Sequence, residues 1–198
     1  MPHNLEKIRM IRIFIIGYMG AGKTTLGKSL ARRLNLNYID TDHFIENRYR
    51  KKVSEIFAAE GEQHFRDIEQ RVLLEVSQFE DIVISTGGGL PCFNDNMAIM
   101  NKSGITIYLD VTEEDLAARL AVSKNVRPVL KKRSGSELTD FIKENLSARR
   151  PFYEQAQIHF QAGAKYSKND IDFLAKEIEN FITTPPRHCE RPIFCKNQ

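Results

Sequence analysis

The stretch Gly17-Tyr18-Met19-Gly20-Ala21-Gly22-Lys23-Thr24 fits the pattern G-x-x-x-x-G-K-[ST] of a phosphate-binding loop. A run of mostly apolar residues from Ile11 to Ile16 precedes it, and an amphipathic segment at 25–34 follows it. Strand, glycine loop and helix in this order place backbone N–H groups and a helix N-terminus around phosphate oxygens. Lys23 can reach the β- and γ-phosphates of a nucleotide, and the Thr24 hydroxyl can bind Mg²⁺. The sequence therefore predicts a nucleotide-binding α/β protein.

The composition is that of an ordinary globular chain. Its 198 residues, 41% of them hydrophobic and 28% charged, suit one domain with a full core. The net charge of +3 is too small to favour nucleic acid, although it suits an anionic small molecule. The three cysteines have no framework or metal-ligand spacing, and neither a long apolar run nor a secretory signal is present. We expect a cytoplasmic monomer with no nucleic-acid or membrane partner.

Strands and helices alternate along the chain, which is typical of a parallel sheet covered on both faces. Further strands are predicted at 36–40, 82–85, 106–109 and 158–160, with a long helix at 62–79 and a last helix capped by Asn169 or Asp170. We expect one domain at 10–183, disordered extensions at 1–9 and 184–198, and a mobile lid at about 121–136, where the chain is basic and contains Pro128 and Gly135. Substrates should bind at the carboxyl ends of the strands.

Two carboxylates, Asp40 and Asp42, close the predicted second strand near the phosphate loop. One of them could organise Mg²⁺ and its water shell, and the other could orient or deprotonate an attacking hydroxyl. The alternative is that Asp42 only caps the next helix, and the spacing alone weighs the two interpretations about equally.

Three further features are candidates for binding an anion. Glu62, Arg66 and Glu69 share a helix face, either as a solvated ion-pair ladder, which the spacing favours, or as a guanidinium held by carboxylates and aimed at a substrate. Thr86-Gly87-Gly88-Gly89 follows the third strand, where glycines let a ligand approach the main chain or simply form a turn. Arg127 in the lid could close over the γ-phosphate.

These motifs occur together, in one order, over residues 10–183, and the chain thereby resembles the shikimate kinase family. The motifs are Gly-x-Met-Gly-x-Gly-Lys-Thr-Thr-x-Gly at 17–27, Asp-Thr-Asp at 40–42, Phe-x-x-x-Gly-Glu-x-x-Phe-Arg-x-x-Glu at 57–69, Thr-Gly-Gly-Gly at 86–89, Arg-Pro at 127–128 and Arg-x-Pro-Phe-Tyr at 149–153. The resemblance implies a three-layer α/β/α P-loop kinase fold with a five-stranded parallel sheet and a mobile lid. It also implies ATP-dependent phosphorylation of the 3-hydroxyl of shikimate in aromatic amino-acid biosynthesis, with Mg²⁺ as cofactor.

The resemblance also implies a role for each matching residue. Lys23, Asp42 and Arg127 would be catalytic, and Thr24 and Asp40 would hold the metal. The nucleotide would contact Gly20, Ala21, Gly22, Lys23, Thr24, Thr25, Arg119 and Arg127. Shikimate would contact Asp42, Phe57, Phe65, Arg66, Glu69, Gly87, Gly88, Gly89 and Arg149, with the two arginines on its carboxylate.

Two alternatives remain open at this point. A gluconate-type or other small-molecule P-loop kinase would share the fold, but the joint presence of Arg66, Arg149 and Thr-Gly-Gly-Gly argues against it. A nucleotide-binding regulator without catalysis would bind ATP and transfer nothing, and the intact Lys23, Asp42 and Arg127 argue against that.

Overall fold

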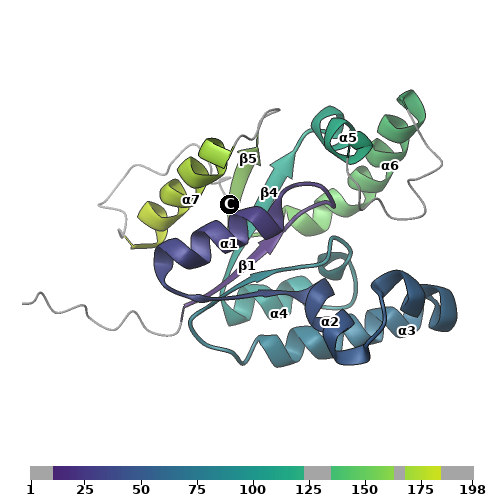
Figure 1. Ribbon diagram of the computed structural model, residues 1–198, viewed down its shortest axis with the longest axis horizontal. Coiled ribbons are helices and arrows are strands. Elements are labelled where there is room, and N and C mark those ends of the chain that lie inside the picture. Colours follow the sequence, from purple (N-terminus) through teal and green to yellow (C-terminus); the bar gives the residue numbers. More distant parts are fainter. Residues whose placement is uncertain (1–10, 123–134, 163–167, 184–198) are drawn as a thin grey trace, which may run out of the picture.

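A five-stranded parallel sheet in the order β2-β3-β1-β4-β5 forms the centre of the computed structural model, which describes residues 11–122, 135–162 and 168–183 (Figure 1). The strands are β1 (Arg12–Ile16), β2 (Asn37–Asp40), β3 (Ile82–Ser85), β4 (Ile105–Val111) and β5 (Ile158–Ala162). All five predicted strands are therefore confirmed. The predicted extensions, residues 123–134 of the predicted lid, and Arg127 within it lie outside the described residues.

Helices cover the sheet. They are α1 (Lys23–Leu34), α2 (Thr41–Tyr49), α3 (Val53–Val76), α4 (Asn96–Ser103), α5 (Glu113–Val122), α6 (Ser136–Tyr153) and α7 (Lys168–Thr183), with a short 3₁₀ turn η1 (Leu90–Cys92). α1 and α7 pack side by side, and β1 lies between α1 and α4 in Figure 1. Right-handed crossovers in this strand order place α3 and α4 on the face opposite α1. The predicted α/β architecture with helices on both faces is therefore confirmed.

Two predicted helix boundaries are wrong. The helix predicted at 62–79 ends at Val76. α3 as a whole begins at Val53, but Gly61, with φ 81° and ψ 171°, divides it into two helical segments, and the second begins at residue 62 as predicted. The sequence analysis found only the half after this glycine, because the apolar spacing does not continue across a kink. The last helix begins at Lys168, so neither Asn169 nor Asp170 is its N-cap.

The central strands are buried on both faces, as expected for a parallel sheet, whereas the edge strand β2 has no buried residue. All four residues of β3 and the last four of β1 are buried. Ser85 at the end of β3 pairs with Ile15 of β1 and Asp40 of β2. Since these three strands end together, the loops that follow them, including the phosphate loop and the glycines at 87–89, meet at one edge of the sheet.

Candidate functional site

The phosphate loop has the backbone that its glycines predict. Gly17, Gly20 and Gly22 have φ values of 142°, 81° and 102°, a region that other residues rarely adopt. Gly22 is the N-cap of α1 without any side-chain cap, and no acidic residue lies in the first turn. The helix N-terminus is therefore electropositive and suited to phosphate oxygens.

Lys23 is buried beneath the loop, with 9% of the residue exposed. Its ammonium donates to the carbonyl oxygens of Gly17 and Tyr18 at 2.9 and 2.8 Å. The loop carbonyls thus hold the Lys23 ammonium inside the phosphate loop. Arg119 of α5 also contacts the phosphate loop, because its Nη1 donates to the carbonyl oxygen of Ala21 at 3.0 Å.

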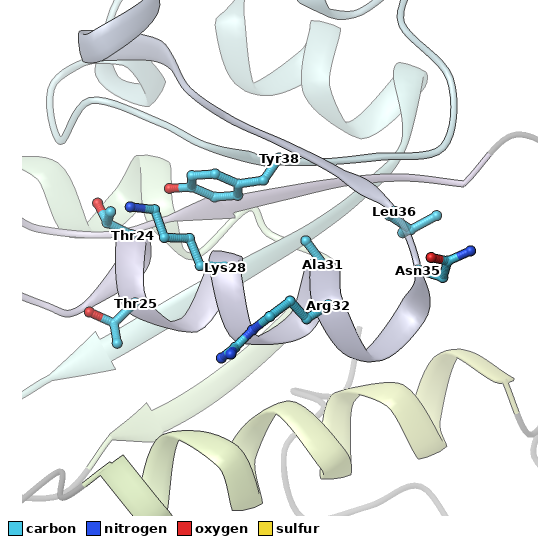
Figure 2. Close-up of a pocket in the computed structure, with 8 residues that line it drawn as sticks. All are labelled: Thr24, Thr25, Lys28, Ala31, Arg32, Asn35, Leu36 and Tyr38. Atoms are coloured by element: carbon cyan, nitrogen blue, oxygen red, sulfur yellow. The ribbon is translucent and has the colours of Figure 1, made fainter.

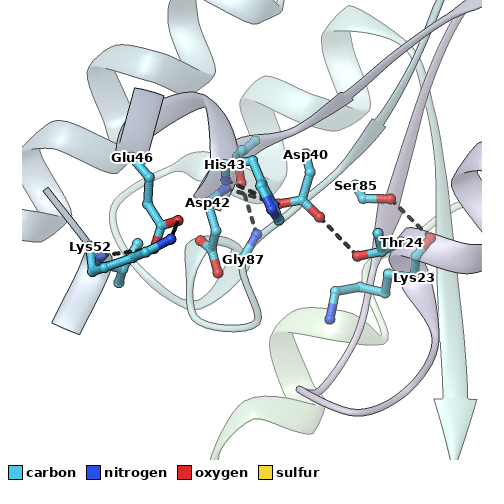
Figure 3. A network of polar contacts seen from close by, with 11 residues as sticks. Lys23, Thr24, Asp40, Asp42, His43, Glu46, Lys52, Ser85 and Gly87 are labelled. Atoms are coloured by element: carbon cyan, nitrogen blue, oxygen red, sulfur yellow. Dashed lines mark hydrogen bonds and ion pairs between the residues drawn. The ribbon is translucent and has the colours of Figure 1, made fainter. Parts of the chain in front are cut away.

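Oxygen atoms suited to a metal ion lie beside Lys23. The Thr24 hydroxyl donates to Asp40 Oδ2 at 2.8 Å, and Ser85 Oγ donates to the Lys23 carbonyl at 3.0 Å (Figure 3). A hydroxyl with a neighbouring carboxylate is a set that Mg²⁺ accepts, since this ion binds few protein oxygens and completes its shell with water and phosphate. The sequence analysis missed Tyr38, two residues before Asp40 on the same face of β2, whose phenol has its pKa raised by burial.

The interpretation of Asp42 as a helix cap is wrong. Asp40 is the N-cap of α2, and its Oδ1 accepts the backbone N–H groups of Asp42 and His43 at 3.1 and 3.3 Å. Because Asp40 already caps the helix, the Asp42 side chain lies elsewhere, next to Gly87 (Figure 3). A Cβ built on Gly87 would lie 2.5 Å from Asp42 Oδ1 and 3.1 Å from Glu69 Oε1. The glycine therefore lets two carboxylates approach the same point of the main chain.

Both interpretations of the Glu62–Arg66–Glu69 face hold in part. The Arg66 guanidinium donates to Glu62 Oε1 at 2.8 Å and to Glu69 Oε2 at 2.6 Å. The Glu62 side chain is 59% exposed and makes an ordinary surface pair, whereas those of Arg66 and Glu69 are 7% and 3% exposed. A buried guanidinium between carboxylates is held in one orientation, as anion recognition requires.

Gly89 leaves room at the outer edge of that guanidinium. A Cβ built on Gly89 would lie 2.6 Å from Arg66 Nη1, 3.0 Å from Nη2 and 3.1 Å from Cζ. A point nearly equidistant from both terminal nitrogens, and farther from Cζ, lies beyond the edge that the two nitrogens share. This is the edge that binds a carboxylate in the bidentate mode.

Aromatic rings enclose Arg66. The Phe57 and Phe65 rings lie 4.5 Å apart, with their centroids 5.4 and 5.6 Å from Arg66 Cζ. Both rings therefore lie beside Arg66, and their contact with a substrate stays a prediction. The sequence analysis missed Phe93, whose ring centroid lies 3.9 Å from Arg66 Cζ. Its only signal in the sequence was its position four residues after Gly89.

Arg149, the second predicted carboxylate ligand, lies on α6. Its Cζ lies 5.4 Å from the Tyr18 ring, and Nη1 is buried without a hydrogen-bond partner among the described residues. Cys92 lies near Arg66 and Arg149. Burial has the largest effect on its thiol and raises the pKa of Cys92 to about 11, although the two positive charges and a hydrogen bond with Tyr153 act to lower it. Tyr153 also donates to the Gly88 carbonyl at 2.6 Å, a contact that the sequence analysis did not foresee.

Two hollows open beside Thr24, one of the residues with an oxygen atom suited to a metal ion. The larger, about 760 Å³, runs along α1 toward the start of β2 (Figure 2), and the smaller, about 240 Å³, includes Asp40 and His43. Thr24, Lys28 and Tyr38 line both of them. In the part of the chain that the structure describes, no cluster of three His, Cys, Asp or Glu could hold a metal, and no helix has the length and apolarity of a membrane span.

A parallel sheet with a phosphate loop after β1, and with carboxylates and a buried arginine at the same edge, defines a P-loop kinase that acts on a small acceptor. The shikimate kinase family model matches residues 19–182. A curated shikimate kinase of Parabacteroides distasonis is 56% identical over 173 residues, which are 87% of this chain and 100% of that protein. The chain belongs to the shikimate kinase family.

Solved structures agree. The crystal structure of shikimate kinase from Bacteroides thetaiotaomicron matches with a TM-score of 0.84 and 47% identity, over 87% of this chain and 98% of that one. Shikimate kinase from Acinetobacter baumannii in complex with shikimate matches with a TM-score of 0.77 and 32% identity, over 88% and 93% of the two chains.

Proposed function

We propose that this chain transfers the γ-phosphoryl group of ATP to the 3-hydroxyl of shikimate, which gives shikimate 3-phosphate and ADP. The observation that carries this assignment is the outer edge of the Arg66 guanidinium, which faces Gly89, two residues along the chain from the glycine that the Asp42 and Glu69 carboxylates approach. Such a site suits a small, hydroxyl-rich acid.

The carboxylate end of the substrate would bind Arg66 and Arg149. Glu69 and Glu62 take up the sides of the Arg66 guanidinium, so its outer edge remains for the substrate. The buried Nη1 of Arg149 supports a second contact, because a buried donor without a partner is costly and a ligand oxygen would relieve the cost. The backbone at Gly88 and Gly89 and the rings of Phe57 and Phe65 would complete the pocket.

The reacting end would lie at Asp42. Its carboxylate would orient the 3-hydroxyl and accept its proton as the oxygen attacks the γ-phosphorus. Lys23 would move from the carbonyl oxygens of the loop to the β- and γ-phosphates, and the amides of residues 20–25 would hold the other phosphate oxygens.

Thr24 and Asp40 would hold Mg²⁺, Thr24 directly and Asp40 directly or through water. The bound ion would neutralise charge on the phosphate oxygens during transfer. For Arg127 over the phosphates and Arg119 on the adenine ring, the support is the match to the family motifs, and for Arg119 also its place beside Ala21.

ADP release in a coupled assay with Mg-ATP tests the proposal, with shikimate, quinate, gluconate and AMP as acceptors. We expect turnover with shikimate. Turnover with another acceptor instead would overturn the substrate, and ATP binding without any turnover would favour the regulator. Lys23→Ala should abolish turnover, and near-normal rates would overturn the role of the loop.

Arg66→Ala separates the acid site from the phosphate site. It should raise the KM for shikimate by roughly 10²-fold or more, because it leaves a substrate carboxylate without its partner. The KM for ATP should stay within about twofold. An unchanged KM for shikimate would mean that Arg66 does not bind the substrate and only stabilises the fold.

A further inference from the structure

Phe93 lies against the arginine of the acid site. Its ring centroid is 3.9 Å from Arg66 Cζ, whereas those of Phe57 and Phe65 are 5.4 and 5.6 Å away. At 3.9 Å the guanidinium and the ring are in van der Waals contact, and among the described residues no ring lies nearer to this cation. Phe93 is therefore in direct contact with the guanidinium.

The backbone around Phe93 is fixed. The 3₁₀ turn η1 follows Gly89 directly, and the buried amide of Asn96 donates to the Leu90 carbonyl at 2.8 Å. Asn94 then turns the chain with a left-handed φ of 51°. Because the ring is presented by a short, pinned turn, its position is set before any ligand arrives.

Hydrogen bonds alone leave one motion of Arg66 weakly restrained. Glu69 fixes Nη1 from inside the protein, but Glu62 is 59% exposed and can follow a turning guanidinium. A tilt of the guanidinium plane would move its outer edge away from the space at Gly89. A ring in van der Waals contact with the guanidinium opposes this tilt directly.

We propose that Phe93 is a positioning residue that fixes the plane of the Arg66 guanidinium, and so the orientation in which a carboxylate substrate binds. This role rests on the proposed function of Arg66 as the carboxylate ligand. It predicts that the ring acts on the affinity for the acid and not on the phosphoryl transfer step.

The test compares Phe93→Leu, which keeps apolar volume without an aromatic face, with Phe93→Tyr, which keeps the face. Phe93→Leu should raise the KM for shikimate about 3- to 30-fold, the range of cation–π contacts from exposed to desolvated sites. The kcat and the KM for ATP should stay within about twofold, and Phe93→Tyr should restore the KM. Phe79→Leu is the matched control, a partly buried ring just before β3 at the opposite edge of the sheet, and it should leave every constant unchanged.

A double-mutant cycle identifies the route, with kcat/KM as the readout where saturation is out of reach. Phe93→Leu should have no further effect in an Arg66→Ala background. An equal loss in both backgrounds would mean that the ring acts without Arg66 and would overturn the positioning role. An unchanged KM in Phe93→Leu would also overturn it, while the separate effect of Arg66→Ala decides the proposed function.

Discussion

Gly89→Ala would place a methyl group in the space that we assign to the substrate carboxylate. The Cβ would lie 2.6 Å from Arg66 Nη1 and 3.0 Å from Nη2. The backbone tolerates the change, because Gly89 has φ −88° and ψ −24°, ordinary values for alanine. The guanidinium can also shift slightly, so we expect the fold to survive.

The expected loss is one of binding. A carboxylate in the bidentate mode makes two charge-assisted hydrogen bonds, each worth about 1.5–3 kcal/mol. Losing one of them amounts to about 1.5–3 kcal/mol, or roughly 10- to 150-fold in the KM for shikimate. The KM for ATP should change by less than about twofold, since the phosphate loop makes no use of Gly89.

Steady-state titration of shikimate at saturating ATP measures this effect, and thermal unfolding checks the fold. The melting temperature should fall modestly, because the new methyl group lies 2.6 Å from a buried guanidinium that must shift to accept it. A near-normal shikimate KM in a folded Gly89→Ala protein would refute the placement of the carboxylate at Arg66. An unchanged melting temperature together with an unchanged KM would refute the geometry at Gly89 as well.

Three further changes test other parts of the site. Gly87→Ala places a Cβ 2.5 Å from Asp42 Oδ1, so steady-state kinetics should show kcat lowered by about 10²-fold with a smaller change in the shikimate KM, and an intact kcat would contradict the role of Asp42 as base. Gly27→Ala places a Cβ 2.6 Å from both Ser85 Oγ and Tyr38 Cε2 in the interior, so the free energy of unfolding should fall by about 1–3 kcal/mol in denaturant titrations, and an unchanged midpoint would mean that the ring moves freely. Because burial raises the pKa of Cys92 to about 11, its alkylation by iodoacetamide should be far slower at pH 8 than that of glutathione and rise about tenfold per pH unit up to pH 10, whereas a rate at pH 8 matching glutathione would contradict the buried thiol.

The sequence predicted the parts of this molecule in which local pattern and local structure agree. The phosphate loop needs glycine at fixed positions, so its pattern predicted both the backbone and the place of Lys23. β1, β3 and β4 were found because buried parallel strands form short apolar runs.

The sequence could not predict features that depend on contacts between distant elements. Spacing could not decide whether Asp42 caps the helix or serves the site, because the answer depends on where α2 begins, and Asp40 proves to be the cap. Phe93 could not be found because its role depends on the stacking of a loop after β3 on a side chain of α3. The burial of Tyr38 could not be predicted, because it results from the packing of β2 against α1 and β3.

Glu69 links the two ends of the proposed acid site. One of its oxygens binds Arg66, and the other lies close to the point at Gly87 that Asp42 also approaches. Gly87 and Gly89 are two residues apart, a separation of at most about 7 Å along the chain. A compact ring acid can span that distance with its carboxylate at Arg66 and a hydroxyl at Asp42 in one rigid pose, whereas an open-chain sugar acid of similar size would lose rotational freedom to do so. The spacing of the two glycines thus favours a cyclic acceptor such as shikimate over gluconate.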